Sequence, residues 1–223
     1  MAATALTFGS TQGRWVLLAS ILGSGVAGLD ATVVNVALLK IGEDLGGGTA
    51  GLQWTLNGYL LTLSALILLG GSLGDRFGRR RVFVIGVIWF AAASLLCGIA
   101  PDIGALVTAR ALQGVGAALL TPGSLSLLQA SFVAEDRGRA IGAWSAFGGI
   151  ATAIGPFVGG YLVDAASWRW IFLLNLPVAA AVVLITLRHV PESSDPEMSK
   201  QIDYGEAVFG AVGLAGLTYA TTS

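Results

Sequence analysis

Six long apolar stretches follow one another along most of this chain. Each offers about 20 mostly apolar residues, the length that an α-helix needs to cross the hydrocarbon core of a bilayer. Only 11% of the residues are charged, whereas an ordinary soluble domain has about 25%. The sequence therefore predicts an all-α integral membrane protein with six spanning helices, at residues 15–39, 52–74, 82–100, 103–129, 139–163 and 170–188.

The connections between these stretches are short, so we expect one compact transmembrane domain over residues 14–188, after an N-terminal segment, 1–13. Two prolines and five charged residues lie in 189–205, which is therefore predicted to be a solvated linker. A further apolar stretch at 206–223 is expected to be the start of a seventh span that is cut short. The first apolar stretch exceeds the core of a signal peptide, about 7–15 residues, and should remain as a span.

The basic residues near the helix ends gather on one side of the predicted bundle. Because positive charge is retained on the cytoplasmic side, this predicts a multi-pass protein of the cytoplasmic membrane with its N-terminus in the cytoplasm. Only Lys40 and Arg169 fall on the opposite side. The residues on the cytoplasmic side are Arg14, Arg76, Arg79, Arg80, Arg81, Arg137, Arg139, Arg188 and Lys200.

Two charged residues, Asp30 and Arg110, lie inside predicted spans, where a charge costs at least about 2.5–3.5 kcal/mol. Helical spacing places Asp30 on a stripe of small residues, and Arg110 on a stripe that includes Gln113. At about 1.5 Å rise per residue, Asp30 lies roughly 13 Å and Arg110 roughly 10 Å from the outer ends of their helices. We therefore expect both charges to point into the bundle and to meet at one level.

This pairing leaves two interpretations open. A partly desolvated carboxylate beside a guanidinium is subject to opposing effects on its proton affinity, and that balance suits the coupling of proton and substrate movement. The alternative is a static buried ion pair.

Residues 71–81 form a second candidate site, between the second and third spans. One interpretation is a positively charged loop whose glycines allow the turn; the other is a conformational latch, in which Asp75 pairs with arginines in one state and releases them in another. A phosphate-binding loop is disfavoured, because no strand precedes the glycines. The candidate latch residues are Gly71, Asp75, Arg76, Gly78, Arg79 and Arg80.

The fifth span carries a third candidate feature. Small residues recur on one face, at positions that include Thr152, Gly155 and Gly159, and Pro156 removes a backbone hydrogen bond. The stripe predicts close approach of another helix. Close packing alone, a hinge and a seal against proton leak all remain open.

Several other classes of function are disfavoured. The net charge of -1 and the absence of a basic face argue against a nucleic-acid partner. Cys97 is the single cysteine, so no internal disulfide and no CxxC metal site are expected. His189 is the single histidine and lies at a helix end, which argues against an enzyme, and no GxxxxGK[ST] loop is present for nucleotide-driven pumping.

These motifs resemble those of the major facilitator superfamily, in particular its drug:proton antiporter branch with fourteen spans. Asp75 and Arg79 match the signature between helices two and three, and Arg110, Gln113, Gly114 and Gly116 match that of helix four. Gly155-Pro156 with Gly159-Gly160 resembles the antiporter signature of helix five. Leu29–Leu38, with Asp30 and Asn35, is similar to the first-helix signature of the branch, as is Trp168-Arg169-Trp170 with Asn175 before helix six.

The resemblance covers nearly all of residues 14–190, with Leu39 departing where the branch usually has proline. It implies an N-terminal domain of two inverted three-helix repeats, followed in the whole transporter by a second six-helix domain. It also implies roles in proton coupling and substrate release for Asp30, Arg110, Gln113 and Asn35, in the latch for Asp75 and Arg79, and in export for Gly155, Pro156, Gly159 and Gly160.

The leading hypothesis is thus a secondary transporter that exports small amphipathic compounds or drugs by alternating access. Its partners would be the substrate, protons, the lipid bilayer and the C-terminal domain, and the proton gradient would serve in place of a cofactor. The rival hypothesis is a membrane protein that binds or senses ligands without transporting them, or an accessory half-domain.

Overall fold

The computed structural model describes residues 5–194 and confirms the six predicted spans as helices. These are α1 (Thr11–Leu45), α2 (Gly48–Phe77), α3 (Arg79–Gly98), α4 (Ile103–Ser131), α5 (Ala134–Ala165), α6 (Trp170–Leu173) and α7 (Asn175–His189). Together, α6 and α7 make the sixth span. The predicted seventh span and most of the linker lie outside the described residues.

The break between α6 and α7 has a local cause. Pro177 has no N–H, so the carbonyl four residues earlier, that of Leu173, lacks its helical donor. Leu174 keeps a helical conformation, with φ -57° and ψ -30°, so the sixth span continues across the break.

Polar residues cap two helices at ends that the apolar stretches alone did not define. The Ser10 hydroxyl accepts a hydrogen bond from the Gly13 amide at 3.1 Å, at the start of α1. The Asp102 carboxylate accepts one from the Ala105 amide at 2.8 Å, at the start of α4. Both caps satisfy backbone donors that a helix end leaves free.

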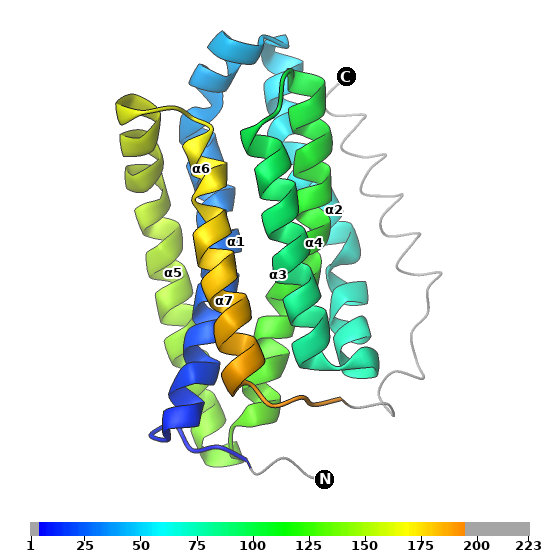
Figure 1. The fold of residues 1–223 in the computed structure, drawn as a ribbon, viewed down its shortest axis with the longest axis vertical. Helices are drawn as coiled ribbons and strands as arrows, with labels where there is room; N and C mark the ends of the chain where they lie inside the picture. The colour runs from blue at the N-terminus through cyan, green and yellow to red at the C-terminus, as the bar shows by residue number, and fades with distance from the viewer. Residues whose placement is uncertain (1–4, 195–223) are drawn as a thin grey trace.

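The helices alternate in direction, so that the start of α1 and the end of α7 lie at the same end of the bundle (Figure 1). Helix α5 packs along α1, and α2 packs along α4. The first three spans correspond in order to the last three: α1 to α4, α2 to α5, and α3 to the α6–α7 span. Under this correspondence, the α1–α5 pair becomes the α4–α2 pair. The packing thus has the pattern of two inverted three-helix repeats.

A layer of polar side chains divides the apolar core in two. One apolar cluster contains Ala27, Tyr59, Phe90 and Ala117, and the other contains residues nearer the opposite end of the bundle. The second cluster includes Val33, Cys97, Leu106, Ala109 and Phe172. On α1, α3, α4 and α7, the residues between the two clusters are the buried polar ones, Asp30, Ser94, Arg110, Gln113 and Asn175.

The small residues of the fifth span predicted close approach of another helix, and the structure shows this over part of α5. Gly155 and Gly159 are buried against Thr32 and Val33 of α1. Gly160 lies near Val36 at the rim of this contact, and a side chain at Gly148 would meet no described atom within 4 Å. Pro156 is exposed in the part of the chain that the structure describes. The glycine stripe is therefore a close contact with α1 only in the C-terminal half of α5.

Glycine also sets the distance between α3 and α4. A Cβ atom at Gly116 would lie 2.6 Å from the backbone nitrogen of Phe90 and 2.8 Å from its Cα. Because backbone atoms cannot rotate away as a side chain can, the two helices would have to separate.

We therefore expect Gly116→Ala to destabilise the protein by about 1–3 kcal/mol, the usual range for an overpacked core. Unfolding of the purified protein in detergent would measure this. Gly142→Ala is the matched control, because its Cβ would enter open space and alanine favours the helix. Equal stability of the Gly116 variant and the wild type would show that α3 and α4 are not in close contact there.

Candidate functional site

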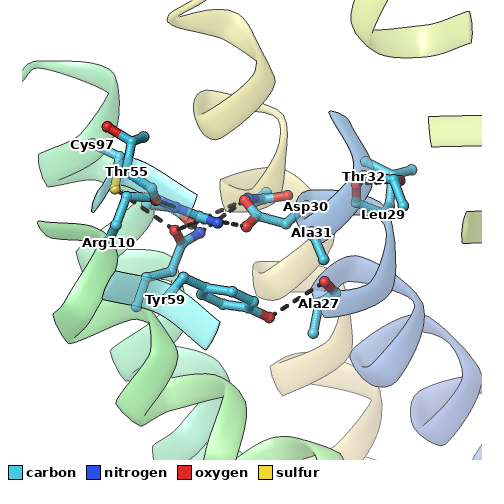
Figure 2. A network of polar contacts seen from close by, with 12 residues as sticks. Ala27, Leu29, Asp30, Ala31, Thr32, Thr55, Tyr59, Cys97 and Arg110 are labelled. Atoms are coloured by element: carbon cyan, nitrogen blue, oxygen red, sulfur yellow. Dashed lines mark hydrogen bonds and ion pairs between the residues drawn. The ribbon is translucent and has the colours of Figure 1, made fainter. Parts of the chain in front are cut away.

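The structure brings Asp30 of α1 and Arg110 of α4 into direct contact, as their predicted depths required. Arg110 Nη1 lies 2.5 Å from Asp30 Oδ2, and each side chain is 1% exposed (Figure 2). A buried pair of this kind gains attraction in a medium of low dielectric but loses the hydration of both ions. The remaining lone pairs and N–H groups must therefore find partners inside the bundle.

Neutral side chains from two helices, α4 and α7, supply further partners for the Asp30 carboxylate. Its Oδ1 accepts hydrogen bonds from Gln113 Nε2 and Asn175 Nδ2, both at 2.9 Å. The same two amides also donate to the Ser94 hydroxyl, at 2.7 and 3.1 Å. Ser94 on α3 therefore fixes the two amides that hold the carboxylate.

Arg110 is held from several directions as well. Its Nε donates to the Thr55 carbonyl of α2 at 3.2 Å, and its Nη1 also donates to Gln113 Oε1 at 2.6 Å. The guanidinium carbon lies 4.3 Å from the ring centre of Tyr59 and 5.8 Å from that of Phe172. Such contacts over ring faces favour a cation without adding a second charge.

Sequence reasoning found part of this cluster and missed the rest. Gln113 is in it, whereas Asn35 is exposed and donates to the Ala31 carbonyl of its own helix at 3.0 Å. Asn175 was noted only as part of a signature, and Ser94 and Tyr59 were not identified as site residues. Asn35 lies four residues after Ala31 and therefore on the same face of α1. That face borders an open groove, which Ala31 lines.

An open groove of about 390 Å³ lies beside the cluster, between α1, α2, α4 and α5. None of its lining residues is charged. The Trp144 indole N–H donates to the Ser24 hydroxyl at 2.7 Å across it. The lining residues are Ser24, Ala27, Gly28, Ala31, Tyr59, Leu60, Leu63, Thr121, Trp144, Ser145, Gly148 and Thr152. The groove is thus suited to an uncharged or amphipathic surface rather than to a fixed counter-ion.

The glycine-rich stretch forms a tight corner, which differs from the loop that the sequence suggested. Helix α2 continues to Phe77 and α3 begins at Arg79, so Gly78 alone joins them, with φ 107°. Only glycine adopts this conformation readily. Across the corner, Arg79 Nε and Nη2 both lie 2.8 Å from Asp75 Oδ1. Gly71 lies one helical turn before this pair and faces Pro122 of α4.

The chain after α7 closes over this corner, a contact that sequence reasoning missed. The Arg80 amide donates to Glu192 Oε1 at 3.0 Å, and the Arg79 amide to the Ser193 carbonyl at 2.8 Å. The Glu192 carboxylate also lies 3.7 Å from Arg80 Nε and 3.9 Å from Arg81 Nε. The guanidinium carbon of Arg76 lies 5.2 Å from the ring centre of its neighbour Phe77. The described part of the predicted linker is therefore a strap on the α2–α3 corner.

The sequence model of the Major Facilitator Superfamily matches residues 20–220. The chain belongs to this family of transporters. It is 41% identical over 212 residues to the methylenomycin A resistance protein of Bacillus subtilis (strain 168), covering 95% of this chain and 45% of that protein. It is 42% identical over 205 residues to the multidrug resistance protein Stp of Mycobacterium tuberculosis, covering 92% of this chain and 38% of that protein. The chain spans less than half the length of these relatives.

Solved structures agree on the fold. A peptide transporter POT in complex with sulfate superimposes with a TM-score of 0.73 at 15% identity, covering 99% of this chain and 47% of that one. The xylose transporter XylE of E. coli, in an inward open conformation, gives 0.67 at 18% identity, with 90% of this chain and 55% of that one covered. Identities this low show the fold alone.

Ser94 provides a test of the polar cluster. In Ser94→Ala, the amides of Gln113 and Asn175 would both lose an acceptor in a buried place, so we expect a loss of about 1–3 kcal/mol of stability. The measurement is unfolding of the purified protein in detergent. Ser72→Ala is the control, because among the described residues that hydroxyl bonds within its own helix, to the Leu68 carbonyl at 3.0 Å. Equal effects of the two substitutions would contradict the cluster.

Proposed function

We propose that this chain is the N-terminal six-helix half of a secondary transporter that exports small amphipathic compounds or drugs in exchange for protons. The observation that carries the proposal is the buried Asp30–Arg110 pair directly beside an uncharged groove. Within the family, a groove between helices supplies a place for substrate, and a buried carboxylate supplies a place for a proton.

The chemistry of Asp30 supports exchange of a proton for substrate. Its carboxylate has one charged partner among the described residues, Arg110, and its other contacts are neutral amides. Protonation of Asp30 would remove the charge that balances the guanidinium. The cluster would then have an unbalanced buried cation, which favours rearrangement of the helices that carry it.

The groove supports a substrate with an apolar or aromatic part. Apolar side chains and the Trp144 ring dominate its lining, and hydroxyl groups such as those of Ser24 and Thr152 provide a few hydrogen-bonding positions. The names of the two relatives describe resistance to methylenomycin A and to multiple drugs. The proposed substrate class agrees with both.

The proposed setting is the cytoplasmic membrane, with the N-terminus and both ends of the six-helix domain in the cytoplasm. The alternating helix directions bring the start of α1, the α2–α3 corner and the end of α7 to one end of the bundle, and the end of α1 and the start of α6 to the other (Figure 1). By sequence, Arg14 and Arg188 belong to the first set of helix ends, and Lys40 and Arg169 to the second. A second domain of the same transporter would complete the groove, in the fourteen-span arrangement. The proton gradient would drive transport, which we propose in preference to catalysis.

The proposed latch is the Asp75–Arg79 pair with its strap. Both side chains are only partly exposed, at 21% and 17%, so their attraction is less screened than that of a surface pair. A non-transporting half-domain would have no use for a latch that opens, so function of the pair discriminates between the two hypotheses.

Asp75→Asn should leave insertion and folding largely intact while reducing efflux to near background, because asparagine preserves the shape of the corner but not its charge. Arg79→Ala should act in the same direction. Efflux from cells that express the full-length transporter is the measurement. Asp102→Asn is the matched control, since asparagine caps a helix as well as aspartate does. Efflux at the wild-type rate in Asp75→Asn would remove the proposed gating role.

Asp30→Asn should uncouple export from the pH gradient while substrate still binds, because asparagine keeps the size of the side chain and one acceptor oxygen for the Gln113 and Asn175 amides but cannot ionise. The measurement is substrate-induced proton release from the purified full-length protein, together with substrate binding. Asp164→Asn, an exposed change on α5, is the control.

A double variant tests whether the two charges act together. Since groups in contact couple by roughly 0.5–3 kcal/mol, adding Arg110→Ala to Asp30→Asn should change stability by less than the sum of the single effects.

In the proton-release experiment, release that persists in Asp30→Asn would make the pair a static structural element and place coupling elsewhere.

A further inference from the structure

Tyr59 on α2 belongs to both sites, since it lines the groove and contacts Arg110 of the ion pair. Its ring centre lies 4.3 Å from the guanidinium carbon of Arg110, and it also lines the groove. Its hydroxyl donates to the Ala27 carbonyl at 3.4 Å, so the side chain reaches from α2 across to α1 (Figure 2).

The ring separates the ion pair from the groove. Ala27 and Ala31, which lie three residues before and one residue after Asp30, line the groove beside Tyr59. Asp30, Arg110 and Tyr59 are each 1% exposed although the groove itself is open. The ring of Tyr59 together with two small side chains therefore stands between the buried carboxylate and the open space.

Two contacts hold the side chain of Tyr59, and one of them is weak. The contact with Arg110 holds the ring face, but the hydroxyl bond to Ala27 is at the long end of the hydrogen-bond range and is correspondingly weak. A molecule in the groove would press on the same ring that covers the guanidinium. Displacement of the ring would also open a route for water from the groove to Asp30.

We propose that Tyr59 is a movable barrier that controls access of water and protons from the groove to Asp30. Occupation of the groove and exposure of the carboxylate would then be linked through the position of one ring. This inference rests on the proposed function, in which the groove takes substrate and Asp30 takes the proton. Tyr59 acts as a positioning residue for the pair.

The test is labelling of Asp30 by a water-soluble carbodiimide in the purified full-length protein, followed by mass spectrometry of the peptide that contains it. In Tyr59→Ala, we expect the labelling rate to rise by about tenfold or more, the scale on which loss of one desolvated contact shifts a local opening. Tyr59→Phe keeps the ring and should label at nearly the wild-type rate.

Two controls separate a local barrier from general loosening of the bundle. Leu63→Ala removes a groove-lining side chain one turn further along α2, and should leave labelling of Asp30 unchanged. Cys97 is buried on α3, with its thiol 3.7 Å from Gln113 Oε1, so its maleimide reactivity should stay low in Tyr59→Ala. A parallel rise at Cys97, or equal labelling of Asp30 in the wild type and Tyr59→Ala, would overturn the barrier.

The labelling requires no transport, so it distinguishes the two proposals. Faster labelling in Tyr59→Ala alone supports the barrier, even in a protein whose wild type releases no protons with substrate. Absence of proton release from the wild type would count against proton-coupled export and not against the barrier. Conversely, a wild type that exchanges protons for substrate, with labelling unaffected by Tyr59, overturns the barrier and leaves the proposed function in place.

Discussion

The ion pair between Asp30 and Arg110 is the interaction on which the rest of this bundle depends. Two charges removed from water lose several kcal/mol of hydration each, and their mutual attraction offsets this only when the geometry is good and the remaining polar atoms are satisfied. Here α2 and α7 each add a direct partner, through Thr55 and Asn175, and Ser94 of α3 holds the amides of Gln113 and Asn175 in place. The pair therefore fixes how five helices meet, and apolar packing fills the space above and below it.

The pair could be predicted from the sequence, whereas most of its surroundings could not. A charge inside an apolar stretch is expensive enough to demand a partner, and rise per residue was sufficient to place Asp30 and Arg110 at one depth. Serine and asparagine carry no such signal, because a single hydroxyl or amide within a span is common and its direction depends on helix rotation. Asn35 shows the same limit, since membership in a signature did not place it in the cluster.

The corner between α2 and α3 shows a second limit of sequence reasoning. Its charges and glycines were recognised, but Gly78 proved to be the whole connection, because the apolar pattern of α2 ends before the helix does. Glu192 was assigned to a solvated linker on composition alone. Its contact with the Arg80 amide joins positions 112 residues apart, and local composition contains no information about a contact that only the folded bundle creates.

Helix α2 connects the three places that the proposed transport cycle uses. Thr55 and Tyr59 contact Arg110, Leu60 and Leu63 line the groove, and Asp75 forms its ion pair with Arg79, the proposed latch, near the end of the helix. Twenty residues of continuous helix span about 30 Å at 1.5 Å per residue, and a helix of this kind moves largely as one body. A shift of α2 along α4 therefore changes the contacts of Arg110, the width of the groove and the geometry of the corner together. Helix α2 in this sense links the buried pair, which its Thr55 and Tyr59 contact, to the proposed latch at its C-terminal end.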